Sequence, residues 1–126
     1  MKTEKRRKGD IGEDVACKYL ENKGYRVVER NYLKPWGEID IVAEKANILS
    51  FVEVKTVTCE NLSGNGVRPE ENFHANKLKR LHRAIQTYLL QHKVPESKAW
   101  QIELACVYLN FTSHKARVEL MENIVL

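Results

Sequence analysis

The chain has 126 residues, of which 43% are hydrophobic and 30% are charged, and its formal net charge is +4. This length and balance are typical of one soluble globular domain and leave no room for a second. Every apolar stretch is shorter than the roughly 20 residues of a membrane-spanning helix, and the basic start has no apolar segment behind it. We therefore expect a cytoplasmic protein with neither a membrane anchor nor a secretory signal.

The net charge is concentrated at the start of the chain. Residues 1–8 contain five basic residues and one acidic residue, so the other residues sum to zero. We expect a flexible basic arm over residues 1–8, followed by a single domain over residues 9–126. The arm is either a solvated terminus or a source of counterion-release affinity for nucleic acid, through Lys5, Arg6, Arg7 and Lys8.

The three cysteines give no sign of a disulfide framework or a zinc site. Cys17, Cys59 and Cys106 are odd in number and widely spaced, and the four histidines form no zinc-like pairing with them. We expect all three to be reduced thiols.

The first half of the chain predicts one helix and three strands. Apolar residues at helical spacing indicate a helix over Asp10–Lys23, with Gly24 at the position of a C-terminal cap. Strands are expected over Tyr25–Arg30, Glu38–Ala43 and Ile48–Thr56, and their short connections favour an antiparallel meander. The second and third strands are apolar on both faces, which is typical of central strands covered on two sides.

The second half begins with a segment, Val57–Asn72, that has no clear period and is long for a loop, so it is either mobile or functional. A helix is then expected over Ala75–His92, and strands over Trp100–Leu109 and Arg117–Met121. The order α-β-β-β-α-β-β predicts a mixed α/β sheet with helices covering its faces.

Charged residues inside the two apolar central strands are the main functional signal. Burying a charge is costly unless it is paired or bound to a metal, yet Asp40, Glu53 and Lys55 all lie in these strands. Side chains alternate across a strand, so Glu53 and Lys55 project from one face, and Asp40 reaches it if the strands pair. The same acid-x-lysine spacing occurs at Glu21 and Glu96, but outside any strand.

A metal site would explain this arrangement. Two close carboxylates repel each other, and Mg²⁺ relieves the repulsion by taking carboxylate oxygens while keeping several waters. Asp40, Glu53 and the Val54 carbonyl would be ligands, with Glu13 as a further ligand or a residue that positions water, and Lys55 would orient the attacking water. The alternatives are a buried ion-pair network and, for Glu13, an exposed helical acid.

These residues carry a family resemblance. Glu38-Ile39-Asp40 followed by Phe51-Val52-Glu53-Val54-Lys55 resembles the PD-(D/E)xK signature of restriction-endonuclease-like nucleases. With Gly12-Glu13, Tyr19-Leu20, Gly24-Tyr25, Asn31-Tyr32 and Gly37-Glu38, the chain resembles the bacterial YraN family, whose members are similar to archaeal Holliday-junction resolvases.

The resemblance implies a restriction-endonuclease-like fold, dependence on Mg²⁺ or Mn²⁺, and a DNA substrate. It implies that Asp40, Glu53 and Lys55 form a catalytic core with Glu13 as helper. Lys77 and Arg80 match the family's basic second helix, although a solvated helix face is an alternative. The chain departs from the family at Val57, where an arginine is common, and at Gln101-Ile102-Glu103, where Arg-Phe-Asp is common.

The sequence thus predicts a metal-dependent DNA endonuclease that selects branched or otherwise structured DNA, with a homodimer expected by analogy to resolvases. One alternative is a module of the same fold that binds nucleic acid without turnover. Another is a structural protein whose acidic cluster only bridges strands.

Overall fold

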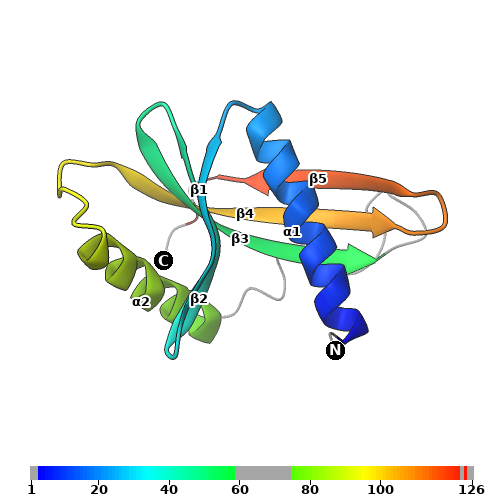
Figure 1. Ribbon diagram of the computed structural model, residues 1–126, viewed down its shortest axis with the longest axis horizontal. Helices are drawn as coiled ribbons and strands as arrows, with labels where there is room; N and C mark the ends of the chain where they lie inside the picture. Colours follow the sequence, from blue (N-terminus) through cyan, green and yellow to red (C-terminus); the bar gives the residue numbers. More distant parts are fainter. Residues whose placement is uncertain (1–2, 59–74, 123, 125–126) are drawn as a thin grey trace.

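The computed structural model describes residues 3–58, 75–122 and 124, which form two helices and five strands (Figure 1). Their order is α1 (Glu4–Asn22), β1 (Arg26–Lys34), β2 (Gly37–Lys45), β3 (Ile48–Thr58), α2 (Ala75–Gln91), β4 (Trp100–Asn110) and β5 (Lys115–Met121). The predicted order of elements and the mixed α/β class are confirmed. Of the predicted loop Val57–Asn72, the first two residues belong to β3, and residues 59–72, including Cys59, lie outside the described residues.

The strands form one sheet in the order β1-β2-β3-β4-β5. The first three strands are the expected antiparallel meander, and β5 pairs antiparallel with β4. The β3–β4 pair is parallel, because the chain returns through α2 before it enters β4. This parallel pair places β3 at the centre of the sheet, where α1 and α2 can approach it from opposite faces.

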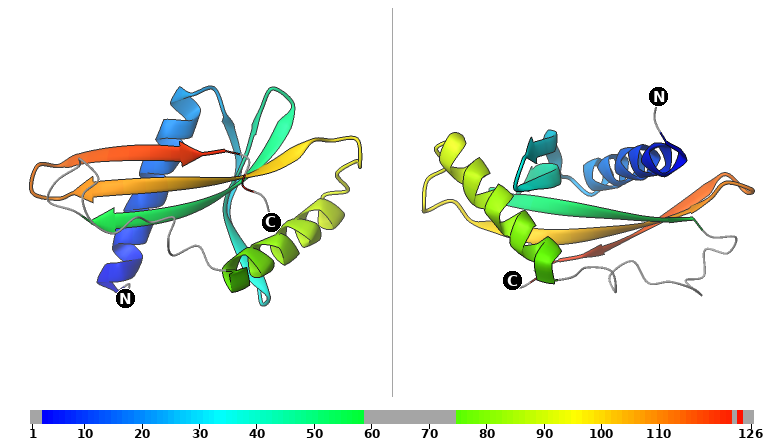
Figure 2. Two further views of the ribbon diagram at one scale, coloured as in Figure 1. Left: turned by 180° about the vertical axis from the view of Figure 1, so that it is seen from behind. Right: turned by 90° about the horizontal axis from the view of Figure 1, so that it is seen from below.

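The helices cover opposite faces of the sheet. Figure 1 shows α1 crossing in front of β3 and β4, and Figure 2, viewed from behind, shows these strands in front of α1. Neighbouring residues of β3 point to different helices, since Val52 packs with α1 and Phe51 with α2. Two large apolar cores result among the described residues: on the α1 side Ala16, Cys17, Leu20, Tyr25, Ile41, Ala43, Val52, Ala105, Val107 and Leu109, and on the α2 side Tyr32, Ile39, Val42, Leu49, Phe51, Leu81, Ala84, Ile85, Tyr88 and Ile102. A smaller third cluster consists of Leu104, Cys106 and Tyr108 in β4.

Helix α1 begins at Glu4, six residues before the predicted start at Asp10. Thr3 is the N-cap, and its hydroxyl accepts a hydrogen bond from the Arg6 amide at 3.1 Å. An ion pair between residues one helical turn apart stabilises this end of the helix, with Lys8 Nζ 3.5 Å from Glu4 Oε1. Residues 4–8, predicted to be a flexible arm, therefore form the first turns of α1. Apolar spacing missed them because these turns extend beyond the apolar face that packs on the sheet.

Strand β2 is paired with β3 over only about half of its own length and then separates from it. The two strands are paired from Ile41 opposite Val52 to Lys45 opposite Ile48, whereas Gly37, Glu38 and Ile39 pair only with β1. The separated end of β2 packs against α2, where a Cβ atom on Gly37 would lie 2.2 Å from the Arg80 carbonyl oxygen. A glycine is needed for this close approach, and the split opens the sheet beside the second half of β3.

The other boundaries differ little from the predicted ones. Strand β1 continues four residues past the expected end at Arg30, and β5 begins at Lys115 instead of Arg117. In the described part of the chain, Cys17 and Cys106 are buried and form no disulfide bond. Neither described helix combines the length and the apolar character that crossing a membrane requires.

Candidate active site

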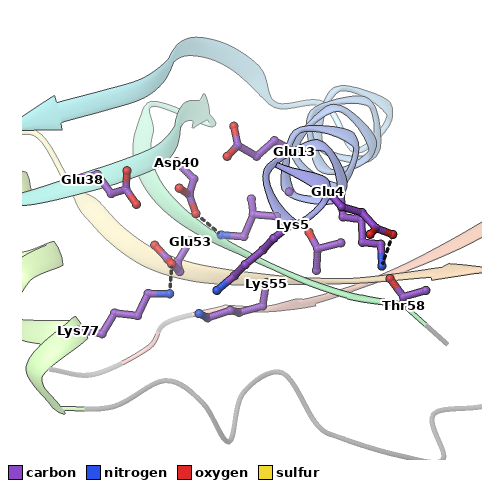
Figure 3. Close-up of a pocket in the computed structure, with 13 residues that line it drawn as sticks. Glu4, Lys5, Glu13, Glu38, Asp40, Glu53, Lys55, Thr58 and Lys77 are labelled. Carbon is purple, nitrogen blue, oxygen red and sulfur yellow. Dashed lines mark hydrogen bonds and ion pairs between the residues drawn. The ribbon is translucent and has the colours of Figure 1, made fainter. Parts of the chain in front are cut away.

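A cleft of about 500 Å³ occupies the opening between β2 and β3 (Figure 3). Because the sheet is split here, side chains from both of its faces reach the same space. All four residues predicted to be catalytic line it, although they come from three different elements. The lining consists of Glu4, Lys5, Lys8, Gly9 and Glu13 from α1, Glu38 and Asp40 from β2, Glu53, Val54, Lys55, Thr56 and Thr58 from β3, and Lys77 from α2.

Asp40 sits where the two strands separate. Its Oδ2 atom accepts a hydrogen bond from the Val54 amide at 2.7 Å, in place of the backbone partner that β2 no longer supplies. The N–H and C=O of one strand residue point to the same side of the strand, so the Val54 carbonyl faces the opening as well. The Asp40 carboxylate and the Val54 carbonyl are therefore directed toward the same opening.

Asp40 is buried beside a second acid. Only 8% of the residue is exposed. Burial, together with the nearby Glu53 carboxylate, raises the pKa of Asp40 from 3.8 to about 8, although the Val54 amide partly opposes the shift. The cleft thus contains two acids, and the Glu53 carboxylate disfavours ionisation of Asp40.

Glu53 has a counterion from the opposite wall. The residue is buried on the α2 face of β3, and its Oε1 atom lies 2.6 Å from Lys77 Nζ in the first turns of α2. Burial by itself lowers the pKa of Lys77, but Glu53 outweighs this effect and the pKa is raised. Sequence reasoning assigned Lys77 to the nucleic-acid surface and missed this pairing, because it joins residues separated by the segment before α2.

Lys55 projects from the same face of β3 as Glu53 and approaches Lys77 (Figure 3). Burial is the main cause that lowers the pKa of Lys55, and the neighbouring Lys77 ammonium lowers it further. An amine with a lowered pKa gives up its proton more easily than an exposed lysine does. Lys55 is therefore suited to hold a water molecule and to exchange a proton with it.

Glu13 is buried, so the alternative interpretation as an exposed helical acid is wrong. Its Oε1 atom is buried and accepts no hydrogen bond from the described part of the chain, and the nearest guanidinium nitrogen of Arg30 is 3.6 Å away. Burial raises the pKa of Glu13, and the Arg30 charge opposes the rise. An unsatisfied carboxylate oxygen beside the cleft is a place for a water molecule or a cation.

Gly12 brings Glu13 to the cleft. A Cβ atom at residue 12 would lie 1.9 Å from Thr56 Oγ1, so α1 crosses β3 at a distance that only glycine permits. The two glycines of α1, Gly9 and Gly12, stand three residues apart and so lie near one another on the helix surface. Only Gly12 takes part in the close crossing, because a Cβ atom on Gly9 would meet nothing within 4 Å.

The basic residues predicted to bind nucleic acid separate into two groups. Lys5, Lys8 and Lys77 line the cleft, and Arg80 lines an adjoining cavity of about 500 Å³ together with Lys77 and Glu38. Arg6 instead forms an ion pair on the helix surface, with its Nε atom 3.6 Å from Asp10 Oδ1. The helical turn explains the separation, because successive residues of the first turns point in different directions.

The donor atoms suit a hard cation, but they are not all gathered in one cluster. Within residues 3–58, 75–122 and 124, no group of three acidic, cysteine or histidine side chains is close enough to hold a metal ion. Mg²⁺ needs only one or two carboxylates, because it keeps several waters. Asp40, Glu53 and the Val54 carbonyl supply such a set of oxygens, and Glu13 is placed to act through water.

Sequence comparison places this chain in a protein family. The model of the uncharacterised protein family UPF0102 matches residues 12–120. The chain belongs to this family. It is the YraN family, whose resemblance the motifs indicated. The match to UPF0102 includes Glu13, Asp40, Glu53, Lys55 and Lys77, whereas the lysines in the first turns of α1 precede it.

Individual UPF0102 proteins are similar over nearly the whole chain. A UPF0102 protein of Campylobacter lari is 38% identical over 116 residues, covering 92% of this chain and 91% of its own. One from Helicobacter hepaticus is 36% identical over 121 residues, covering 96% of both chains. One from Alkaliphilus oremlandii is 36% identical over 115 residues, covering 91% of this chain and 94% of its own.

Proposed function

We propose that this protein is a metal-dependent endonuclease that hydrolyses phosphodiester bonds of DNA in the cytoplasm. The observation that carries the proposal is the meeting of Asp40 and Glu53 at the split between β2 and β3, with Lys55 on the same face. Two buried acids that cannot both ionise cheaply, next to a lysine with a lowered pKa, fit metal-assisted hydrolysis better than a purely structural role.

Each cleft residue has a distinct task in this proposal. A Mg²⁺ or Mn²⁺ ion held by Asp40, Glu53 and the Val54 carbonyl would supply Lewis acidity toward a phosphate oxygen. Lys55 would hold the attacking water and exchange its proton. The Glu13 Oε1 atom, which accepts no hydrogen bond within the described residues, would accept one from a water on the α1 side and so help to position it.

The surroundings of the site favour a nucleic acid recognised by its shape. Lys5 and Lys8 on α1, and Lys77 and Arg80 on α2, flank the acidic centre from two sides. Lysines on a cleft wall position phosphates and carry no direct information about base sequence. We therefore propose branched or otherwise structured DNA as the substrate, cut by a homodimer because a four-way junction offers two symmetric positions.

Cleavage assays on a panel of DNA structures test the proposal. The wild type should cut a four-way junction or a fork with Mg²⁺ or Mn²⁺, and Glu53→Ala and Lys55→Ala should each lose about 100-fold or more in rate. Glu96→Ala and Lys98→Ala are matched controls, because they alter the same acid-x-lysine spacing in a turn. Absence of cleavage of junction, single-stranded and duplex DNA, together with absence of divalent metal binding, would overturn the proposal.

A second candidate is a nucleic-acid-binding module that has the fold but does not turn over. Two observations favour it: Glu53 already pairs with Lys77, and the described acids form no three-carboxylate cluster. This candidate expects salt-sensitive DNA binding that survives Asp40→Ala and Glu53→Ala, with no products under either metal. Cleavage by the wild type that is lost in both variants supports the nuclease, whereas binding by all three proteins without any product supports the binding module.

A further inference from the structure

The contact between Glu53 and Lys77 joins the centre of the sheet to the start of α2. Glu53 is 4% exposed and accepts the Lys77 ammonium at 2.6 Å, whereas the Lys77 side chain is 35% exposed. A buried carboxylate needs a counterion, and here a partly exposed lysine from another element provides it. One partner of the pair is therefore fixed in the core, and the other can turn outward.

The lysine and a divalent cation compete for the same atom. In the proposed function, Glu53 is one of two carboxylates that hold the metal, and its Oε1 atom is already in contact with Lys77. A divalent ion at that position would also face Lys55, which approaches Lys77 from β3. Because like charges at such short range repel strongly, the metal and the Lys77 ammonium cannot both remain beside Glu53.

The structure offers Lys77 a second position. The adjoining cavity of about 500 Å³ is lined by Lys77 itself, by Glu53 and Glu38, and by Arg80. Glu38 is exposed and borders both this cavity and the main cleft. A lysine displaced from Glu53 would find another carboxylate there, at the edge of the cleft where a substrate phosphate would pass.

We infer that Lys77 is an exchangeable counterion of Glu53, which divalent metal displaces toward Glu38 when it enters the site. This inference rests on the proposed metal-dependent function and assigns to Lys77 a role in regulating it. Lys77 is a positioning residue that pairs with the Glu53 carboxylate and holds it in place without metal, and it lowers the affinity for metal by competition. Metal binding then frees its positive charge at the mouth of the cleft.

Direct measurement of Mn²⁺ binding, without DNA, tests the exchange. Free Mn²⁺ is measured by its electron paramagnetic resonance signal in wild type, Lys77→Met and Lys79→Met. Lys79 lies two residues away on the same helix and is exposed, so it controls for the loss of one charge. Lys77→Met should bind Mn²⁺ about tenfold more tightly than Lys79→Met, because the competitor is gone. Equal affinities, or weaker binding by Lys77→Met, would overturn the inference.

A second measurement uses only the wild type, so it does not depend on the folding of a variant. Lysine side chains are labelled with an amine-reactive acetylating reagent, with and without saturating Mg²⁺, and quantified by mass spectrometry. Labelling of Lys77 should rise at least twofold with Mg²⁺ relative to Lys79, and unchanged labelling would refute the exchange. If neither wild type nor Lys77→Met binds Mn²⁺, the proposed metal-dependent function fails as well, whereas metal binding without any Lys77 effect rejects this inference alone.

Discussion

Asp40 has two roles in the cleft: it accepts a backbone hydrogen bond, and it contributes a carboxyl group next to Glu53. It accepts the Val54 amide where β2 has left β3, and it places a second carboxylate near Glu53. An apolar residue at position 40 would leave the Val54 amide without this acceptor, which by itself is destabilising. The structural and the proposed catalytic roles of Asp40 therefore depend on the same side chain.

The raised pKa of Asp40 predicts how metal-free stability varies with pH. The folded protein holds a proton on Asp40 up to about pH 8, whereas the unfolded chain releases it near its ordinary pKa of 3.8. Folding therefore binds a proton between these values, so the contribution to the free energy of unfolding is full at low pH and declines as pH rises through this window.

Urea titrations in EDTA between pH 4 and pH 9 measure this contribution. Asp40→Asn keeps an oxygen for the Val54 amide and cannot ionise, so its stability should decline less with rising pH than that of wild type. Glu96→Gln, at an exposed position, should follow wild type. Parallel curves for wild type and Asp40→Asn would contradict a raised pKa at this residue.

Another buried acid, Glu103, belongs to a hydrogen-bond network away from the cleft. Glu103 is completely buried and accepts hydrogen bonds from the Tyr25 hydroxyl at 3.1 Å and from the Gln101 amide at 3.0 Å. Tyr25→Phe removes one donor from a buried carboxylate and should lower the free energy of unfolding by about 1–3 kcal/mol. Tyr19→Phe, which alters a more exposed hydroxyl in α1, is the control in the same urea titration.

The elements are held together at two glycines that allow a helix to touch a strand. Gly12 lets α1 approach Thr56 in β3, and Gly37 lets the β1–β2 hairpin approach the backbone of α2. These contacts set the two walls of the cleft, because Glu13 follows Gly12 and Glu38 follows Gly37. Helix packing and the position of the candidate site are thus decided by the same residues.

Alanine substitutions in α1 separate helix propensity from close packing. Gly9→Ala should stabilise the protein by up to about 1 kcal/mol, because nothing lies within 4 Å of the added methyl and alanine favours a helix. Gly12→Ala should destabilise it by about 1–3 kcal/mol, because the methyl would overlap the Thr56 side chain. Thermal unfolding measures both, and stabilisation by Gly12→Ala would show that α1 does not cross β3 this closely.

At the scale of the whole molecule, the split sheet brings basic residues from both helices around an acidic centre. Lys5 and Lys8 enter the cleft from α1, whereas Arg6 and Arg7 do not line it. For DNA binding, the positions of the basic residues therefore matter more than the net charge of +4. Charges that border the cleft act directly on a phosphate backbone in it, whereas charges elsewhere act at long range and are screened by salt.

DNA binding at several salt concentrations checks this placement. Relative to wild type, Lys5→Gln/Lys8→Gln should weaken binding to a four-way junction and reduce the salt slope by about 0.9 for each phosphate that is no longer neutralised. Arg6→Gln/Arg7→Gln removes the same charge outside the cleft and should change both quantities much less. Equal effects of the two double variants would place the DNA elsewhere on α1.

The order of elements and most strand positions were predictable because hydrophobic periodicity is a local property of the sequence. The apolar runs of β2 and β3 and the stripe of α2 show directly in neighbouring residues. The start of α1 was misplaced because Thr3 and the charged turn after it have no apolar pattern. The predicted mixed sheet is confirmed, but the sequence did not indicate that β3 and β4 are its parallel pair, since this depends on where α2 packs.

The sequence by itself determined the family and the order of elements, and it showed that Asp40, Glu53 and Lys55 lie in two central strands. Only the tertiary structure decided that β2 leaves β3 at Asp40, that Glu13 is buried at the opening, and that Lys77 pairs with Glu53. The physical reason is the separation along the chain over which each interaction acts. Periodicity and charge placement act between near neighbours in the chain, whereas a split sheet and an ion pair between β3 and α2 depend on contacts that exist only after folding.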